Sequence, residues 1–277
     1  MACYTEWMPP VDIDAAVIAN ARLSRDYSVL SLAAPEVGRR TQPGQFVMVK
    51  PAGVTDPLLR RPFSVFEVLR NANGEVTGVS ILNKRAGRST NKLYELEEGD
   101  VVSCLGPLGV PFTPVVAPME AWMVAGGVGL APFATLAESL AASRAPATLF
   151  YGARTGDELF YIDFFSALGI TIVLTTEDGT GGVKGRVTAP LESALKTVGP
   201  AGAMVYACGP EPMLEAVAKL AARYHQPSQV SVERVMGCGL GGCYSCVVPV
   251  KHGDEHANLV RSCISGPVFD GADLVWE

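Results

Sequence analysis

The sequence predicts an antiparallel β-barrel, then an α/β domain built on a parallel sheet, and then a small cysteine-rich module. Three observations predict this order: short alternating apolar runs in about the first hundred positions, alternating strands and helices after a proline-rich stretch at 114–118, and four cysteines among the last forty residues. We expect the domains to cover residues 11–113, 114–228 and 229–277. A chain of 277 residues, 48% of them apolar, is long enough for this division.

The barrel is predicted from six short runs with period-two alternation and from the turns between them. Pro43-Gly44 and Asn73-Gly74 are strong turn signals, and Gly99-Asp100 opens the last run. Strands at such close spacing favour an antiparallel barrel. The expected strands are 11–22, 27–32, 45–50, 63–69, 76–82 and 101–105.

The α/β domain is predicted from apolar strands that alternate with helical segments, a pattern typical of a parallel sheet covered on both faces. The most apolar stretch, 121–137, is slightly short of a membrane span and contains three glycines and a proline. We therefore interpret it as a buried strand, a glycine turn and a helix. The expected strands are 121–125, 147–151, 171–175 and 203–207, and the expected helices are 131–142, 160–168, 188–195 and 211–224.

The charge pattern and the N-terminus argue against several functions. The formal net charge is −6 and no run rich in lysine or arginine is present, so an electrostatic footprint for nucleic acid is lacking. The first ten residues, MACYTEWMPP, have neither the basic start nor the apolar centre of a secretory signal. We expect a cytoplasmic protein that binds neither membrane nor nucleic acid.

Four cysteines carry the clearest chemical signal. Cys238, Cys243, Cys246 and Cys263 have the spacing C-x4-C-x2-C-x16-C, which is that of a plant-type [2Fe–2S] cluster. The loop GCGLGGCYSC is rich in glycine, so backbone N–H groups can approach the sulfides unobstructed. A structural zinc site is the alternative, although zinc ligands usually form two CxxC-like pairs and only one is present. The remaining cysteines are scattered: Cys3, Cys104 and Cys208.

Two motifs in the first domain suit a phosphate-bearing ligand. Arg61-Pro62-Phe63-Ser64 stands at the start of an expected strand, although this motif alone is a weak signal because surface arginines are common. Gly87-Arg88-Ser89-Thr90 precedes a short expected helix at 91–96. Ser89 or Thr90 could cap this helix, whose N-terminus favours an anion such as a pyrophosphate.

Two motifs in the second domain suit a dinucleotide. Gly126-Gly127-Val128-Gly129 follows an apolar strand and opens a helix, the position of a phosphate-binding loop in α/β sheets. A glycine turn required only for packing is the alternative. Cys208-Gly209-Pro210 ends a later strand, where a small thiol could contact a nicotinamide ring. The alternative there is a buried structural cysteine.

The order of these motifs along nearly the whole chain, RPFS, GRST, GGVGLAP, CGPEPM and then the four cysteines, resembles the ferredoxin–NADP reductase superfamily. The C-terminal segments CGLGGCYSC and RSCISGPVFD are similar to the electron-transfer subunits of the NAD-linked, class-B dihydroorotate dehydrogenases. The segment Thr176-Glu177-Asp178-Gly179, followed by Lys184-Gly185, is also similar to that family.

The resemblance implies an FAD-binding barrel, an NAD-binding α/β domain and a [2Fe–2S] module. A carboxylate at Glu177 or Asp178 would accept a bond from the adenosine 2′-hydroxyl and repel a 2′-phosphate, which favours NAD over NADP. The family often has an aromatic residue at position 83 and glycine at position 89. The implied FAD residues are Arg61, Pro62, Phe63, Ser64, Leu82, Asn83, Lys84, Ser89 and Thr90, and the implied NAD(H) residues are Gly126, Gly127, Val128, Gly129, Cys208, Gly209 and Pro210.

The three sites form one path, because NAD exchanges a hydride, the cluster passes single electrons, and a flavin converts between them. The resemblance implies an FMN-containing dihydroorotate dehydrogenase subunit as the partner, in a two-plus-two heterotetramer that serves de novo pyrimidine (UMP) biosynthesis. No general acid or base is then required in this chain. The alternatives are a reductase subunit that couples NAD(P)H to ferredoxin, a hydrogenase or a sulfur reductase, and a non-catalytic interaction subunit.

Overall fold

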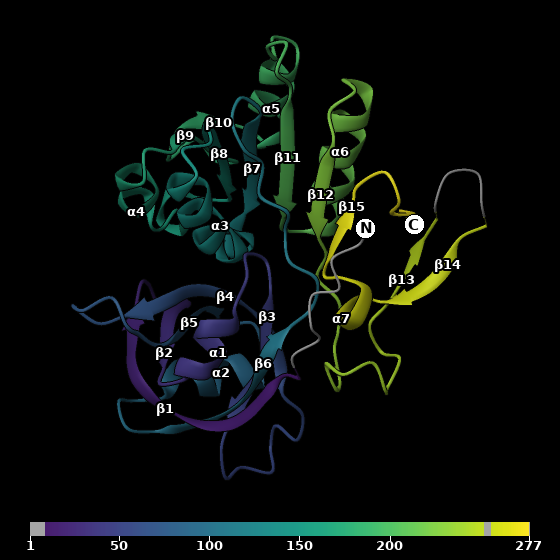
Figure 1. The fold of residues 1–277 in the computed structure, drawn as a ribbon. Coiled ribbons are helices and arrows are strands. Elements are labelled where there is room, and N and C mark those ends of the chain that lie inside the picture. The colour runs from purple at the N-terminus through teal and green to yellow at the C-terminus, as the bar shows by residue number, and fades with distance from the viewer. Residues whose placement is uncertain (1–8, 252–255, 277) are drawn as a thin grey trace.

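The computed structural model describes residues 9–251 and 256–276, so Cys3 lies outside the described residues. Figure 1 shows a barrel below, a sheet with helices above it, and a small module beside both. This architecture confirms the predicted fold class. Within the described ranges, no helix has the length and apolar character needed to cross a membrane.

Six antiparallel strands close the barrel, as predicted. Their order around the barrel is β1-β2-β5-β4-β3-β6. Alternate side chains of these strands point inward and form a buried aliphatic core that includes Leu30, Val47, Val65 and Ile81. The strands are β1 (Val11–Arg22), β2 (Tyr27–Leu32), β3 (Phe46–Pro51), β4 (Arg61–Arg70), β5 (Val76–Lys84) and β6 (Val101–Leu108).

Two short helices lie against the barrel, α1 (Pro35–Arg40) and α2 (Arg88–Glu95). The sequence does not predict α1, because a six-residue segment with a proline and a glycine has low helix propensity. The prediction for α2 is wrong at its start, since the helix begins at Arg88 rather than at residue 91. Leu93 of α2 is fully buried and joins the barrel core, which holds this helix in place.

The second domain is a seven-stranded sheet in the order β10-β9-β8-β7-β11-β12-β15. Neighbouring strands are parallel except β15, which pairs antiparallel with β12. The four predicted strands are confirmed, whereas β10, β12 and β15 have only two to four residues, too few for a pattern in the sequence. The strands are β7 (Glu120–Gly126), β8 (Ala147–Ala153), β9 (Thr171–Thr176), β10 (Val183–Lys184), β11 (Ala203–Cys208), β12 (Ser228–Ser231) and β15 (Val268–Asp270).

The four predicted helices are confirmed, and they cover both faces of the sheet. The helices α3 (Ala131–Ala142) and α4 (Ile162–Ala167) share one apolar core with the sheet, and α5 (Thr188–Leu195) and α6 (Glu211–Arg223) share the opposite one. The chain runs from β7 outward through β8 and β9 and then places β11 on the other side of β7. This reversal is the topological switch point at which open α/β sheets bind their ligands.

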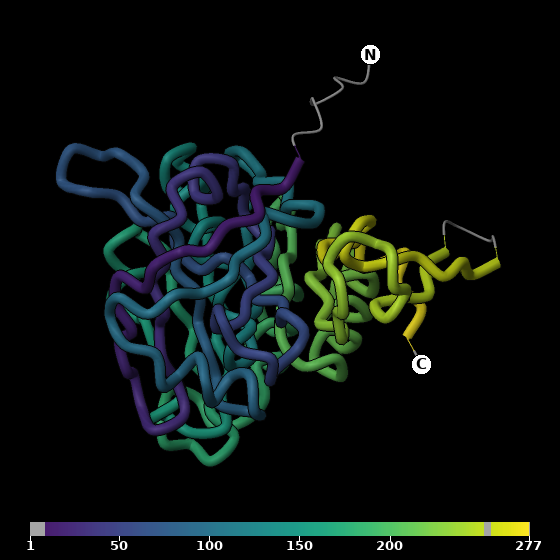
Figure 2. The backbone as a smooth tube through the Cα atoms, turned by 90° about the horizontal axis from the view of Figure 1, so that it is seen from below, coloured from purple at the N-terminus to yellow at the C-terminus, as the bar shows by residue number. Residues whose placement is uncertain are grey.

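The cysteine-rich segment packs against both domains. It holds the two-stranded sheet of β13 (Val247–Val250) and β14 (Asn258–Arg261), followed by α7 (Ser262–Ser265) and β15. Figure 2 shows this yellow segment to one side of the main body. The expected domain boundaries stay predictions, and β12 runs across the one at 228/229. The contacts with the barrel form a small apolar core of Phe46, Met48, Leu105, Leu108, Met236, Cys246 and Cys263.

An aromatic cluster joins the barrel to the sheet. The ring of Phe112, which follows the last barrel strand, lies 5.7 Å from that of Phe133 on α3 and 5.4 Å from that of Tyr206 on β11. The Tyr206 hydroxyl donates to the carbonyl oxygen of Thr113 (2.8 Å) and accepts from the N–H of Val115 (3.1 Å). These contacts fix the linker and therefore the relative position of the two domains.

We expect Tyr206→Phe to lower the thermal unfolding midpoint, because two hydrogen bonds that anchor the linker are lost, at a cost of about 1–2 kcal/mol. Differential scanning calorimetry of the cofactor-loaded chain measures this. Tyr224→Phe is the matched control, since the hydroxyl that it removes donates, among the described residues, to the partly exposed Glu192 on the helix surface. Equal shifts in the two variants would contradict an anchoring role for Tyr206.

Candidate functional site

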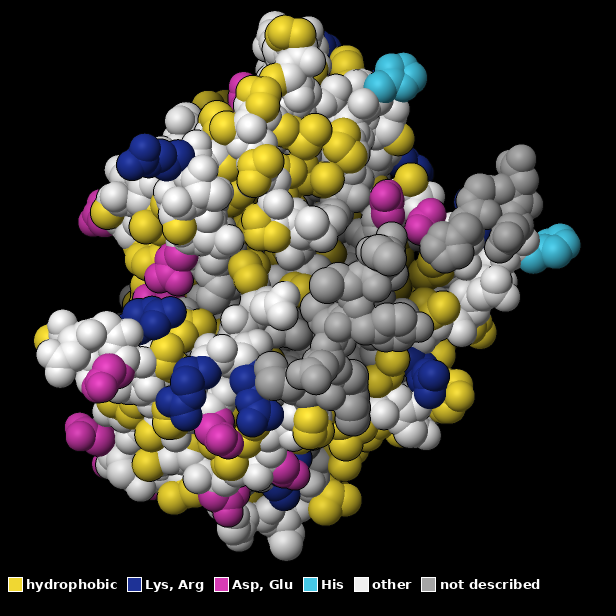
Figure 3. All heavy atoms as spheres, viewed as in Figure 1, with side chains coloured by type: hydrophobic (Ala, Val, Ile, Leu, Met, Phe, Trp, Pro, Cys, Tyr) yellow, Lys and Arg dark blue, Asp and Glu magenta, His cyan; other side chains and the backbone are white. Residues whose placement is uncertain are grey.

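A large hollow lies where the barrel, the sheet and the cysteine-rich segment meet. Its volume is about 1160 Å³. Barrel residues from β4, β5 and the start of α2 form one wall, and residues 231–236 form the opposite wall. On the face shown in Figure 3, basic side chains of the barrel are interspersed with acidic ones. Size and position make this hollow the candidate site for the largest expected ligand, FAD.

The first residues of β4 line this hollow, as the RPFS motif predicts: Arg61, Pro62, Phe63 and Ser64. On β5 the alternation of side chains separates the three residues expected there. Leu82 and Lys84 line the hollow, whereas Asn83 points the other way and is fully buried. Its Nδ2 donates to the carbonyl oxygen of Thr90 (3.1 Å), so Asn83 holds α2 against the barrel.

The N-terminus of α2 faces the same hollow, through Gly87, Arg88, Ser89 and Thr90. Gly87 is the N-cap residue, and both hydroxyl residues lie in the first turn. Of the two residues expected to cap the helix, Thr90 takes part in the cap, because its Oγ1 accepts hydrogen bonds from the N–H groups of Ala86 (2.8 Å) and Gly87 (3.0 Å). The positive end of the helix and the neighbouring hydroxyls still suit an anionic group.

A second hollow of about 410 Å³ lies at the carboxyl edge of the sheet, at the switch point. Gly126, Gly127 and Val128 of the glycine motif line it, together with Pro210 of the Cys208-Gly209-Pro210 motif. Gly127 has φ +55°, a conformation that favours glycine. These residues leave the backbone open to a ligand.

Two of the expected glycines contribute to packing and not to the lining of either hollow. A Cβ atom on Gly129 would lie 2.2 Å from the carbonyl oxygen of Cys208, so this turn packs directly on the end of β11. Gly209 has φ +152°, and a Cβ atom there would lie 2.7 Å from the Met213 side chain. The packing alternative given for the glycine motif therefore applies to Gly129, and Gly209 has a packing role as well.

The structure separates the two carboxylates expected near the adenosine ribose. Glu177 lines the second hollow at the end of β9. Asp178 lines a different surface hollow, and its Oδ1 accepts hydrogen bonds from the N–H (2.9 Å) and Oγ1 (2.7 Å) of Thr180. These hydrogen bonds lower the pKa of Asp178. Asp178 thus stabilises a loop, and of these two carboxylates it is Glu177 that lines the candidate nucleotide site.

The two hollows meet at three residues that line both, Lys84, Val128 and Glu233. Cys208 lines the larger hollow beside them and is 3% exposed, and burial raises the pKa of its thiol. Burial also raises the pKa of Glu233. Glu233 is not among the residues expected from the sequence. The available signal is that it is the one acidic residue in the segment VSVERV, where valines alternate with other residues.

The four clustered cysteines form two neighbouring pairs. Hydrogen bonds lower the pKa of Cys243 to about 6; those with Ser245 contribute most, and those with Cys238 add to the effect. Burial is the main reason why the pKa of Cys263 is raised to about 12. The Cys246 side chain is the next contribution, and Cys238 adds to the same rise. The Cys243 thiol thus interacts with Cys238, and Cys263 packs with Cys246 in the small apolar core beside the barrel.

This arrangement fits a two-iron cluster, in which two thiolates bind each iron. In the parts of the chain that the structure describes, no three His, Cys, Asp or Glu side chains are grouped to hold a metal ion, so the choice between a cluster and a zinc site rests on the spacing of the cysteines. The loop suits bound sulfur, since the Leu240 N–H points at the Cys238 Sγ (3.3 Å) and Gly239 and Gly241 have φ +71° and +79°.

Arg261 stabilises the loop that carries three of the cysteines. Its guanidinium donates to the carbonyl oxygen of Gly241 (2.9 Å) and lies 4.8 Å from the centre of the Tyr244 ring. Met236 connects this region to the flavin site, because it packs with Cys246 and Cys263 and also lines the larger hollow. The candidate cluster and flavin sites thus share one wall.

Three family models match successive parts of the chain. An oxidoreductase FAD-binding domain matches residues 14–112 and an oxidoreductase NAD-binding domain matches residues 123–219. The iron-sulfur cluster binding domain of dihydroorotate dehydrogenase B matches residues 233–275. The chain is therefore an oxidoreductase with FAD, NAD and iron–sulfur sites.

Solved structures show the same fold. The structure of an NADH-dependent reduced ferredoxin-NADP oxidoreductase has a TM-score of 0.82 and 26% identity, over 95% of this chain and 90% of that one. A ferredoxin NADP+ reductase from Neisseria gonorrhoeae with bound FAD and NADP has a TM-score of 0.65 at 16% identity, over 77% of this chain and 91% of that one. The second likeness concerns the fold alone.

Similar curated proteins include two that carry the name dihydroorotate dehydrogenase B (NAD(+)), electron transfer subunit. The protein from Desulforamulus reducens is 34% identical over 95% of this chain and 98% of its own length. The protein from Geobacillus kaustophilus is 39% identical over 93% of this chain and 96% of its own length. With this identity over nearly complete chains, and with the matching iron–sulfur domain, the chain belongs to the family of electron transfer subunits of dihydroorotate dehydrogenase B.

Proposed function

We propose that the chain carries electrons from an FMN-containing dihydroorotate dehydrogenase subunit, through a [2Fe–2S] cluster and FAD, to NAD+. This reaction serves de novo pyrimidine (UMP) biosynthesis. The observation that supports it most is that the three candidate sites adjoin in a row. Met236 packs with Cys246 and Cys263 and also lines the larger hollow. The two hollows in turn share three lining residues, Lys84, Val128 and Glu233.

The larger hollow offers two kinds of lining that suit FAD. Arg61, Ser64, Ser89, Thr90 and the N-terminus of α2 suit the phosphates. Apolar side chains such as Phe63 and Leu82 suit the flavin ring. FAD, when bound, converts between the hydride that NAD carries and the single electrons that the cluster passes.

The smaller hollow suits NAD(H). We assign the phosphates to the backbone of 126–128 and the adenosine ribose to Glu177. Gly129, Gly209 and Asp178 shape the loops around this site without facing it.

The junction of the hollows is where a flavin and a nicotinamide ring would meet. Cys208 presents a small side chain there, and its raised pKa keeps the thiol protonated at neutral pH, so it contacts the rings without acting as a base. Glu233 is the acidic residue that lines both hollows, and its raised pKa lets it hold a proton closer to neutral pH than an exposed glutamate does.

The cluster loop offers a surface for the partner. Leu240 and Tyr244 on the loop and Ile264 on α7 are 55%, 62% and 48% exposed, which is unusual for large apolar side chains around one feature. We propose that this surface docks the FMN-containing subunit in a two-plus-two heterotetramer. A cytoplasmic location is part of this proposal, since free cysteine ligands persist in a reducing compartment.

A second candidate function is a reductase subunit that couples NAD(P)H to ferredoxin. The likeness at 26% identity to the NADH-dependent reduced ferredoxin-NADP oxidoreductase structure favours it, because that likeness covers 95% of this chain. The two functions differ in the partner and not in the three sites of this chain.

Co-purification with a tagged chain tests the choice. We expect an FMN-containing subunit to co-purify and the complex to form orotate with NAD+. Cys243→Ser should abolish the visible iron–sulfur absorbance and orotate formation with NAD+, while NADH still reduces the FAD of this chain. Cys104→Ala is the control, because this buried barrel cysteine lies outside the cluster. Recovery of a ferredoxin oxidoreductase or hydrogenase as the partner would overturn the pyrimidine assignment.

Ser245 provides a test of the cluster assignment. Its Oγ accepts the Gly237 N–H (2.9 Å) and lies 3.2 Å from the Cys243 Sγ, so its own proton is available to a ligating thiolate. Hydrogen bonds to cluster sulfurs raise the reduction potential. Ser245→Ala should therefore make the midpoint potential more negative in an EPR-monitored titration. Ser265→Ala, at an exposed position near Cys263, should leave the potential unchanged; a shift of equal size there would remove the assignment of Ser245.

Glu177→Arg tests the nucleotide assignment. The change replaces repulsion of a 2′-phosphate by attraction, so the ratio of kcat/KM for NADPH to that for NADH should rise about tenfold. Stopped-flow reduction of FAD measures both values. Asp178→Asn removes a neighbouring charge that faces another hollow and should leave the ratio near that of the unmodified chain. An unchanged ratio in Glu177→Arg would place the adenosine elsewhere.

A further inference from the structure

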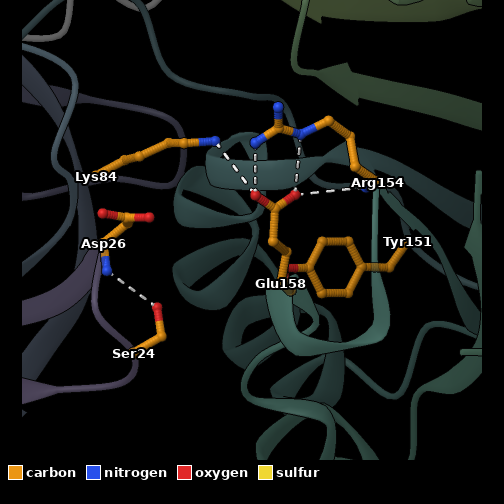
Figure 4. Close-up of polar contacts among 6 residues, drawn as sticks. All are labelled: Ser24, Asp26, Lys84, Tyr151, Arg154 and Glu158. Atoms are coloured by element: carbon orange, nitrogen blue, oxygen red, sulfur yellow. Dashed lines mark hydrogen bonds and ion pairs between the residues drawn. The ribbon is translucent and has the colours of Figure 1, made fainter. Parts of the chain in front are cut away.

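Glu158 pairs with two basic side chains, one from each domain, at the edge of the smaller hollow. Figure 4 shows its carboxylate between Lys84 of the barrel and Arg154 at the end of β8. The Oε1 lies 2.9 Å from the Arg154 guanidinium and 3.7 Å from the Lys84 Nζ. All three residues line the hollow assigned to NAD(H).

The backbone holds Glu158 firmly in this place. Glu158 ends a short 3-10 turn (Gly156–Glu158), and its carbonyl oxygen accepts a hydrogen bond from the buried Tyr151 hydroxyl (3.0 Å). The Gly156 N–H donates to the Thr180 Oγ1 (2.7 Å) on the neighbouring loop. The hydrogen bond from Arg154 lowers the pKa of Glu158, and Lys84 adds to this, so the carboxylate is charged at neutral pH.

Arg154 stands beside the residue assigned to the adenosine ribose. It follows β8, and Glu177 follows the adjacent β9. The Glu177 N–H donates to the carbonyl oxygen of Ala153 (3.1 Å), and the Asp178 N–H donates to that of Arg154 (3.2 Å). In dinucleotide-binding sheets an acidic residue here binds the 2′-hydroxyl, whereas a nearby arginine accommodates a 2′-phosphate.

An arginine at this edge would by itself favour the phosphorylated nucleotide. The Arg154 side chain is 69% exposed, and in the hydrogen bonds of the described residues it bonds to Glu158 alone. Two nitrogens of its guanidinium, Nε and Nη2, are directed at the Glu158 carboxylate (3.5 and 2.9 Å). The carboxylate therefore offsets the charge of the guanidinium and occupies one two-nitrogen edge on which a phosphate could bind.

We propose that Glu158 is a specificity-determining residue that withholds Arg154 from a nucleotide 2′-phosphate. Glu177 repels the phosphate directly, and Glu158 removes the cation that would attract it. The inference rests on the proposed binding of NAD(H) in this hollow. Discrimination against NADPH then comes from two carboxylates, of which only one would touch the ribose.

Binding of AMP and of 2′-phospho-AMP to the cofactor-loaded chain tests the proposal by isothermal titration calorimetry. Glu158→Gln should tighten binding of 2′-phospho-AMP relative to AMP by about fivefold, the size of one exposed ion pair. The gain should shrink at high ionic strength. Arg154→Gln in the Glu158→Gln background should abolish it.

Asp157→Asn is the matched control, since it removes the same charge from the same turn at an exposed residue that lines another hollow. An unchanged ratio in Glu158→Gln, or an equal gain in Asp157→Asn, would overturn the proposal. A gain that survives Arg154→Gln but disappears with Lys84→Gln would overturn it as well, because Lys84 would then be the cation concerned. Failure of the unmodified chain to bind AMP or to be reduced by NADH would instead refute the proposed function.

Discussion

The close contact of two chain segments at the switch point of the sheet is the constraint on which the rest of the structure depends. A Cβ atom on Gly129 would lie 2.2 Å from the carbonyl oxygen of Cys208, so only glycine lets the turn after β7 rest on the end of β11. Because these segments touch, residues 126–128 face the smaller hollow while Cys208 faces the larger one. The two hollows therefore meet, and a nicotinamide can lie beside a flavin.

The same principle of shared walls extends to the cysteine-rich segment. Its strand β15 extends the sheet, and Met236, Cys246 and Cys263 pack on the barrel through Phe46 and Met48. The segment is thus held by both domains although it has little core of its own. This double attachment places the cysteine loop against a wall of the larger hollow, through Met236.

Charge is arranged locally in a molecule whose net charge is −6. Basic residues line both hollows, with Arg61 and Arg88 in the larger one and Lys84 and Arg154 at the edge of the smaller one. Glu158 pairs with the last two, and Glu177 adds a further negative charge to the adenosine end. Attraction for the phosphates common to all nicotinamide nucleotides can thus coexist with discrimination against an additional one.

The sequence by itself determined the features that depend on local pattern. Period-two alternation predicts the barrel strands, the strand-to-helix order predicts the parallel sheet, and the spacing of Cys238, Cys243, Cys246 and Cys263 predicts the cluster. Only the tertiary structure decided which side chains line the candidate sites: Leu82 and Lys84 but not Asn83, and Glu177 but not Asp178. It also revealed Glu233 and Glu158, since the direction of a side chain and its charged neighbours depend on strand register and on contacts between segments far apart in the chain, which no local pattern records.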